Sequence, residues 1–241
     1  MVATMNLGFW QLRRLDTRQA HNATVVARNN EPAAPLTEAL SALADGSSTE
    51  DLRYVQVWVE GAWDLDREVL LVNRSQDGVP GVHVLSFLLV DDIAPASGLV
   101  VDRGFVPRPL QLAGDRSAWA PASRTALLRG SLDVFQFGER SYGSEVDRID
   151  RGALEVRWGA ELAPMWLRVA EPTGGDVWPT PTPVVSLGDG RHLSYAVQWF
   201  IFTLIGVVGY PLVLIRVHRS SDSRSEGGPN PFIPEWDAPV A

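Results

Sequence analysis

An uncharged segment near the end of the chain constrains most strongly what this protein can fold into. Residues 193–215, LSYAVQWFIFTLIGVVGYPLVLI, contain no Asp, Glu, Lys or Arg, and His192 precedes them directly. A helix of this length spans roughly 34 Å, which exceeds a hydrocarbon core of about 30 Å. The alternative is a buried helix of a soluble domain, but such helices rarely run so far without a polar stripe. The sequence therefore predicts a transmembrane helix over 192–216, with Tyr195 and Trp199 suited to the membrane interface.

The charges that flank this segment predict its orientation. Arg216, Arg219 and Arg224 follow it, and the positive-inside rule places them in the cytoplasm. The tail over 217–241 is then expected to be cytoplasmic and disordered, and the region 20–190 to be an extracytoplasmic domain.

The start of the chain does not explain how such a domain would cross the membrane. MVATMNLGFWQ is apolar but is only about half the length of a spanning helix, and no cleavage pattern follows. We therefore expect translation to start upstream, with residues 1–19 as the end of a first membrane helix and its exit segment. The alternative is a cytoplasmic domain for which the charge rule fails. The expected protein is multi-pass and lies in the plasma membrane of a bacterium.

Composition excludes several classes of function. The net charge of −8 argues against nucleic-acid binding, which needs a basic face. No cysteine is present, which excludes disulfides, thiolate metal sites and covalent haem attachment through C-x-x-C-H. All 21 basic residues are arginine, which we attribute to a GC-rich bacterial genome.

The region between the two ends predicts an α+β domain with a dominant antiparallel sheet. Its segments alternate apolar and polar residues, as in YVQVWVEG, and turn signals separate them. Strands are predicted over 54–61, 69–74, 82–90, 97–107, 125–135 and 164–172. Helices are predicted over 36–43 and 145–162, and a proline-rich tether over 171–190. This pattern favours a sheet curled into a barrel or sandwich-like domain covered by one or two helices.

The residues show no catalytic constellation. Motifs for nucleophilic, zinc or nucleotide chemistry are missing, and the four histidines are dispersed along the chain. Asp102 and Arg103 in VVDRGFVPR are interpreted as a paired polar end of a β-strand. We therefore predict no catalytic residue and a protein that is not an enzyme.

The start of the chain resembles a known family. LGFWQLRRLDTR is similar to the motif G-x-W-Q-x-x-R-x-x-x-K of the Surfeit locus protein 1 (Shy1) family. Gly8, Trp10, Gln11 and Arg14 match this motif, and Arg18 stands where lysine is usual. The chain resembles an actinobacterial-type member.

Further segments resemble the same family, in the same order. They are EPAAPL, YVQVWVEGAWDLDREVLL, PGVHVLSFLLV, VVDRGFVP and HLSYAVQWF, the last similar to the opening of the family's second membrane helix. The chain departs from the family pattern at Ser86, where proline is usual, at Asp102, where asparagine is usual, and at Gly190 and Arg191. Any one motif is weak, but five in register are specific.

The resemblance implies a role in the biogenesis of haem-copper cytochrome c oxidase, around haem a and its insertion into the catalytic subunit. It implies haem a as a transient cofactor, and the oxidase catalytic subunit, haem a synthase, respiratory supercomplex subunits and membrane lipid as partners. It also makes His192 the ligand of the haem iron. Tyr195 and Trp199 share a helix face with His192 and could pack against a porphyrin, while Gln198 could offer a polar contact.

Alternatives remain open from the sequence. His192 could cap the helix at the level of the lipid headgroups, with Tyr195 and Trp199 as interfacial anchors. The whole protein could be a non-catalytic accessory subunit stably bound to the oxidase or its supercomplex. An enzyme of haem a maturation would need a redox or hydroxylating centre, which this sequence lacks.

Overall fold

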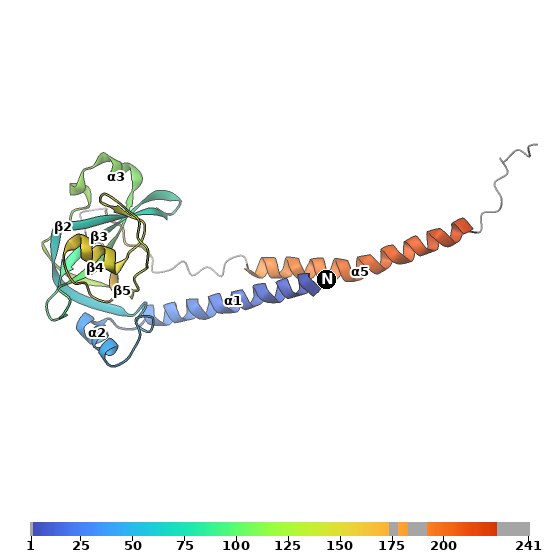
Figure 1. Ribbon diagram of the computed structural model, residues 1–241, viewed down its shortest axis with the longest axis horizontal. Helices are drawn as coiled ribbons and strands as arrows, with labels where there is room; N and C mark the ends of the chain where they lie inside the picture. The colour runs from blue at the N-terminus through green and yellow to red at the C-terminus, as the bar shows by residue number, and fades with distance from the viewer. Residues whose placement is uncertain (1, 174–177, 183–191, 226–241) are drawn as a thin grey trace, which may run out of the picture. The chain divides into compact units, whose positions relative to one another are not determined.

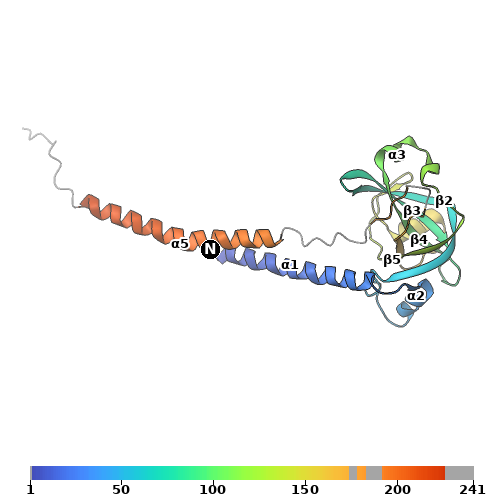
Figure 2. The same cartoon turned by 180° about the vertical axis from the view of Figure 1, so that it is seen from behind.

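Two units make up the chain. The computed structural model describes residues 2–173, 178–182 and 192–225. Contacts divide the chain into a helical unit, Met1–His21 with Gly188–Ala241, and a domain, Asn22–Leu187. Figures 1 and 2 show the long helices α1 (Val2–Asn29) and α5 (His192–Ser225) and the strand-rich domain.

Helix α5 has the length and composition of a membrane-spanning helix. Its segment Leu193–Val217 has a mean hydropathy of 2.1, and most of its side chains are exposed in the described structure. One candidate span of this kind fits a membrane protein. The helix continues to Ser225, past the predicted end at residue 216, so residues 217–225 are helical and not irregular. Residues 226–241 of the predicted tail lie outside the described residues.

Eight strands of the described chain form one mainly antiparallel sheet. The order along the sheet is β3-β4-β8-β5-β2-β7-β6, and β2 pairs with β3 as well. The longer strands are β2 (Gln56–Gln76), β3 (Val79–Leu89), β4 (Gly98–Pro107), β5 (Thr125–Asp133) and β8 (Trp166–Val169). The short strands are β1 (Ala34–Pro35), β6 (Ser141–Tyr142) and β7 (Glu145–Val146).

Strand β2 closes the path of pairings. Its first part pairs with β5, from Gln56 to Ala62, and the rest pairs with β3. The path β2-β3-β4-β8-β5 therefore returns to the strand on which it began. The prediction of an α+β fold with a dominant antiparallel sheet is confirmed, while the finer alternatives of barrel and sandwich stay predictions.

The sequence divided β2 wrongly into two strands, 54–61 and 69–74. The polar segment between them suggested a break, but the strand runs through it. A register shift between Asp64 and Glu68 absorbs the extra residues, as a β-bulge does.

The helix predicted over 145–162 is shorter, as α4 (Arg151–Trp158). It begins where the Asp150 carboxylate accepts a hydrogen bond from the Ala153 amide at 3.2 Å, a normal N-cap. It ends at Gly159, whose φ of 61° lies in the left-handed region that glycine tolerates. Residues before the cap form β7, which pairs with Leu70 and Leu71.

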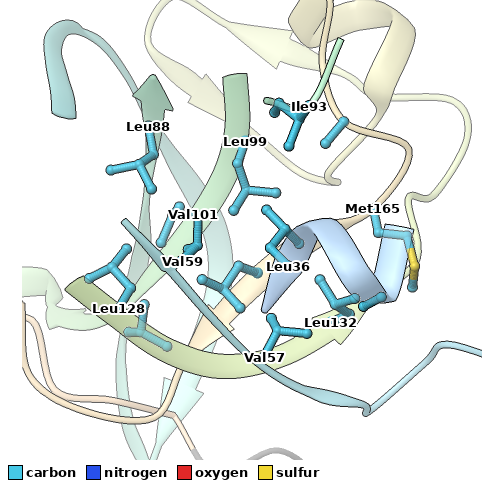
Figure 3. Packing of buried hydrophobic residues seen from close by; sticks show 14 of the residues in the cluster. Leu36, Val57, Val59, Leu88, Ile93, Leu99, Val101, Leu128, Leu132 and Met165 are labelled. Atoms are coloured by element: carbon cyan, nitrogen blue, oxygen red, sulfur yellow. The ribbon is translucent and has the colours of Figure 1, made fainter. Parts of the chain in front are cut away.

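The core lies on two faces of the sheet. Successive residues of a strand point to opposite faces, so Val100 and Val101 belong to different clusters. The helix α2 (Leu36–Ala44), which the sequence predicted over 36–43, packs with Leu36 on the cluster that contains Val57, Val101 and Leu132 (Figure 3). Helix α4 packs on the other cluster through Leu154 and Trp158.

The region 171–190 is not only a tether. Thr180 exchanges two backbone hydrogen bonds with Phe105 of β4, at 2.8 and 3.0 Å. The described residues 178–182 therefore belong to the domain. The segments 174–177 and 183–190 lie outside the described residues.

Candidate functional site

The first turns of α5 hold the residues that the sequence assigned to haem a. His192 is the first residue of this helix, and its side chain lies outside the described structure. Tyr195 is 47% exposed, Gln198 is exposed, and Trp199 is half-buried. The Trp199 ring meets the Phe202 ring edge-on, with 5.9 Å between centroids. The structure thus places Tyr195, Gln198 and Trp199 on the turns that follow His192.

Another side of α5 packs against α1. A Cβ added at Gly8 would lie 2.8 Å from the Phe200 ring, so only glycine fits there without displacement. The Phe9 and Phe200 rings meet edge-on at 5.5 Å, and the Thr203 hydroxyl donates to the Thr4 hydroxyl at 2.8 Å. Small residues and hydroxyl bonds of this kind hold helices together in lipid, where apolar burial contributes little.

This packing gives the G-x-W-Q motif of α1 a physical reason. Gly8 permits the approach of Phe200, while Trp10 is exposed and has the Arg14 guanidinium 5.6 Å from its ring centroid. Such a cation–π pair suits the polar boundary of a membrane. Within this motif, Gly8 therefore contacts α5, whereas Trp10 is exposed to the surroundings of the helix pair.

The domain holds a second group of polar residues, which sequence reasoning missed. Asp102 is 1% exposed, and its Oδ2 lies 2.9 Å from His83 Nδ1. Its other oxygen accepts the Gly104 amide at 3.0 Å. With Asp102 ionised, His83 Nδ1–H donates to it, and His83 Nε2 is left to accept the Thr182 hydroxyl at 3.3 Å.

The Asp102–His83–Thr182 series resembles a hydrolytic triad in its order of contacts. However, both His83 and Asp102 are buried, and Thr182 belongs to the segment that pairs with β4. The contacts from Asp102 to His83 and from His83 to Thr182 therefore hold residue 182 against the domain. The signal that could have found it is the charged pair in VVDRGFV, in the middle of an apolar strand.

Arg103 has its own, separate set of partners. It is fully buried, with Nε donating to Thr173 Oγ1 at 3.1 Å and Nη1 lying 3.5 Å from Glu68 Oε2. Burial lowers the pKa of the Arg103 guanidinium to about 10, and attraction to Glu68 opposes this shift. The interpretation of Asp102 and Arg103 as a paired strand end is wrong, because neighbours on a strand point to opposite faces and bind different partners.

A cavity of about 250 Å³ lies beside Asp102. Asp133 lines it and pairs with Arg53 at 2.9 Å and with Arg168 at 3.2 Å. Arg74 lines it as well. Within residues 2–173, 178–182 and 192–225, no three His, Cys, Asp or Glu side chains group as metal ligands.

Comparison with known proteins agrees with the motifs. The model of the SURF1 family matches residues 1–204. An uncharacterized SURF1-like protein of Mycobacterium bovis and one of Mycobacterium tuberculosis are each 27% identical over 236 residues, which covers 93% of this chain and 83% of the relative. The matched residues include Gly8 on α1, the Asp102–Arg103 pair on β4 and the first turns of α5, and the chain belongs to the SURF1 family.

Proposed function

We propose that this protein is a membrane-bound assembly factor of haem-copper cytochrome c oxidase that acts in the delivery or insertion of haem a into the catalytic subunit. Its family is generally linked to cytochrome oxidase assembly. The observation that carries the proposal is the start of α5. There, Tyr195 and Gln198 are exposed on the two turns that follow residue 192, while Phe200 and Thr203 contact α1.

The residues at this position fit a haem. A neutral imidazole is a common axial ligand of haem iron, so His192 would hold the metal. Tyr195 and Trp199 would pack against the macrocycle, and Gln198 would supply a polar contact. Bound haem would contribute only its own ligation chemistry, because the protein is proposed to carry haem a transiently and not to react with it.

The proposed setting is the plasma membrane of a bacterium. In this proposal residues 20–190 lie outside and residues 217–241 lie in the cytoplasm, which the arginines after residue 215 favour. The proposed partners are the oxidase catalytic subunit, haem a synthase and supercomplex subunits, together with membrane lipid around α5. A site at the mouth of a membrane helix suits transfer to a subunit that is itself embedded in the membrane.

The test compares two alanine variants of the full chain, expressed with a source of haem a and purified in detergent. His192→Ala should lose the Soret band and impair oxidase maturation, whereas Gln198→Ala should keep most of both. If His192→Ala retains its Soret band and normal maturation, His192 is not the ligand and the proposal fails.

A second candidate function is a non-catalytic accessory subunit that stays with the oxidase or its supercomplex. Val156 on α4 and Phe137, between β5 and β6, favour it, because these large apolar side chains are 86% and 87% exposed. Stoichiometric co-purification with the mature oxidase, weakened by Phe137→Ser, would favour this function. Recovery of the mature enzyme without this chain would exclude it.

A further inference from the structure

The cavity beside Arg74 carries more positive than negative charge. Its walls include the guanidinium groups of Arg53, Arg74 and Arg168, but only two carboxylates, those of Asp102 and Asp133. His83 also faces it and is already bonded to Asp102. Even with a neutral imidazole, the lining has an excess of one positive charge.

Both carboxylates of the cavity already accept hydrogen bonds from other groups of the protein. Asp133 Oδ1 accepts from Arg53 Nε and from the Val134 amide, and Oδ2 accepts from Arg168. Asp102 accepts from His83 and from the Gly104 amide. The polar groups that line the cavity therefore leave one cation, Arg74, without a carboxylate of its own.

Arg74 is half-buried and carries unused donors. Among the described residues, no carboxylate oxygen lies within 4.0 Å of its guanidinium, and its hydrogen bond runs from Nη1 to the neighbouring Asn73 carbonyl at 3.3 Å. Burial lowers the pKa of Arg74, as does the nearby Arg168, and attraction to Asp102 and Asp147 opposes this only in part. A guanidinium has five N–H donors in a fork that matches an oxyanion, so a half-buried one facing a cavity is an anion receptor.

Two strand irregularities coincide with this cavity. The β2–β3 register shifts between Leu71 and Arg74, and Asn73 there adopts a φ of 60°, which a non-glycine residue rarely takes. The β3–β4 register shifts between His83 and Leu85. Bulges re-aim side chains and cluster near binding sites, so the local backbone is shaped for the residues that line the cavity and not for regular pairing.

The remaining walls decide the class of anion. Leu71, Val134 and Ile149 are apolar, and the Tyr54 and Trp166 rings lie under Arg53 and Arg168, each 5.0 Å from the guanidinium carbon. A bare phosphate would leave such walls unused, whereas a short alkyl chain would cover them. The volume equals that of about eight waters and is smaller than the pocket of a drug-sized ligand.

We propose that this cavity binds a carboxylate carried on a short alkyl chain, with Arg74 as the group that pairs with it. The ligand is either a free small carboxylate or the propionate arm of a larger molecule, such as a porphyrin. Only the second source rests on the proposed function. The site lies wholly within the domain, so its test does not require the helices to bind anything.

The first experiment titrates the full chain, in detergent, with propionate and with propionamide, its uncharged analogue, by calorimetry or saturation-transfer NMR. Wild type should bind propionate with a Kd on the order of 1 mM and bind propionamide at least tenfold more weakly. Arg74→Gln should weaken propionate binding at least tenfold. Arg129→Gln removes an exposed arginine of β5 that does not line the cavity, and should leave binding unchanged.

If Arg74→Gln does not fold, Arg74→Lys tests the proposal in its place. It keeps the charge but loses the fork, so binding should weaken severalfold in a folded protein. Unchanged binding in the folded Arg74 variants would overturn the proposal, as would equal binding of propionamide or of phosphate by wild type.

The second experiment separates the two sources with metal-free protoporphyrin and its dimethyl ester. If the porphyrin arm is the ligand, Arg74→Gln weakens binding of the diacid severalfold and leaves the ester unaffected. If Arg74→Gln affects binding of the diacid and of the ester equally, and wild type binds propionate, the ligand of the cavity is a free carboxylate. If wild type binds neither propionate nor the diacid, the proposal is wrong. Because no iron is present, ligation by His192 takes no part in these measurements, which separates this site from the proposed haem ligand.

Discussion

Gly8 on α1 lies directly against the ring of Phe200 on α5. A Cβ at position 8 would come within 2.8 Å of two ring carbons of Phe200, closer than side chains pack. The hydroxyl groups of Thr4 and Thr203 meet one turn away, at 2.8 Å. Glycine at position 8 therefore sets how closely the two helices approach.

We expect Gly8→Ala to loosen this helix pair. The chain has no cysteine, so Thr4→Cys with Thr203→Cys provides a clean disulfide reporter. Adding Gly8→Ala to this reporter should lower the yield of the cross-link severalfold. Gly209→Ala adds the same methyl group to α5, where the nearest atom is 4.0 Å away in Ile205, and should not change the yield. Equal yields in both variants would mean that Gly8 does not determine the packing.

We expect Asp102→Ala to destabilise the domain by roughly 3 kcal/mol, because it leaves the buried His83 and the Gly104 amide without an acceptor. Asp102→Asn keeps an oxygen for Gly104 and should be milder. The free energy of unfolding, from urea titration of the full chain in detergent, measures both. Asp91→Ala, at an exposed position, should stay within about 0.5 kcal/mol of wild type. If Asp102→Ala also stays within about 0.5 kcal/mol of wild type, the contact with His83 does not contribute to the stability of the domain.

Local patterns in the sequence predicted local structure well. The alternation in YVQVWVEG predicted the first part of β2, and the turn before PGVHVLSFLLV and the uncharged run after His192 predicted β3 and α5, each of which depends on residues close in the chain. The N-cap at Asp150 and the left-handed Gly159 were present in the sequence too, but the apolar periodicity extended past them and predicted too long a helix.

The buried polar partners could not be predicted in the same way. Asp102 meets His83 across 19 residues, and Arg103 meets Glu68 across 35 residues and Thr173 across 70. These contacts follow from the register of β3 on β4 and from bulges, and a shift of one residue would send each side chain to the other face. The cavity beside Arg74 depends on the same register, so only the folded chain reveals it.

We expect Arg103→Lys to be nearly as damaging as a loss of the side chain. Arg103 donates from separate nitrogens to Thr173, to Glu68 and to the Trp119 carbonyl, and it lies 5.4 Å from the Trp63 ring centroid. A single ammonium group cannot reach all of these positions. Unfolding in urea should show a loss of about 2–4 kcal/mol for Arg103→Lys. Arg124→Lys, at an exposed position, serves as the control. Wild-type stability in Arg103→Lys would show that charge alone suffices at this site.

Glu139 should make the stability of the domain depend on pH in an unusual direction. Its side chain is 3% exposed, and among the described residues its Oε2 has no hydrogen-bond partner. Burial raises the pKa of Glu139 above its ordinary value, and Arg157, 3.8 Å away, opposes this only in part. Below the ordinary pKa both the folded and the unfolded chain hold the proton. As pH rises through the raised pKa, the folded state must bury the charge and loses stability.

Glu139→Gln should remove this loss. Its free energy of unfolding should match wild type in acid, near pH 4, and exceed it increasingly toward neutral pH, because the amide has no proton to give up. Arg157→Gln removes the opposing cation, so its free energy of unfolding should fall further than that of wild type as pH rises. Glu60→Gln, at an exposed position of β2, serves as the matched control. Urea titrations at several pH values give these differences directly. A Glu139→Gln difference that stays constant across the range would show that the carboxyl of Glu139 ionises as freely in the folded chain as in the unfolded one.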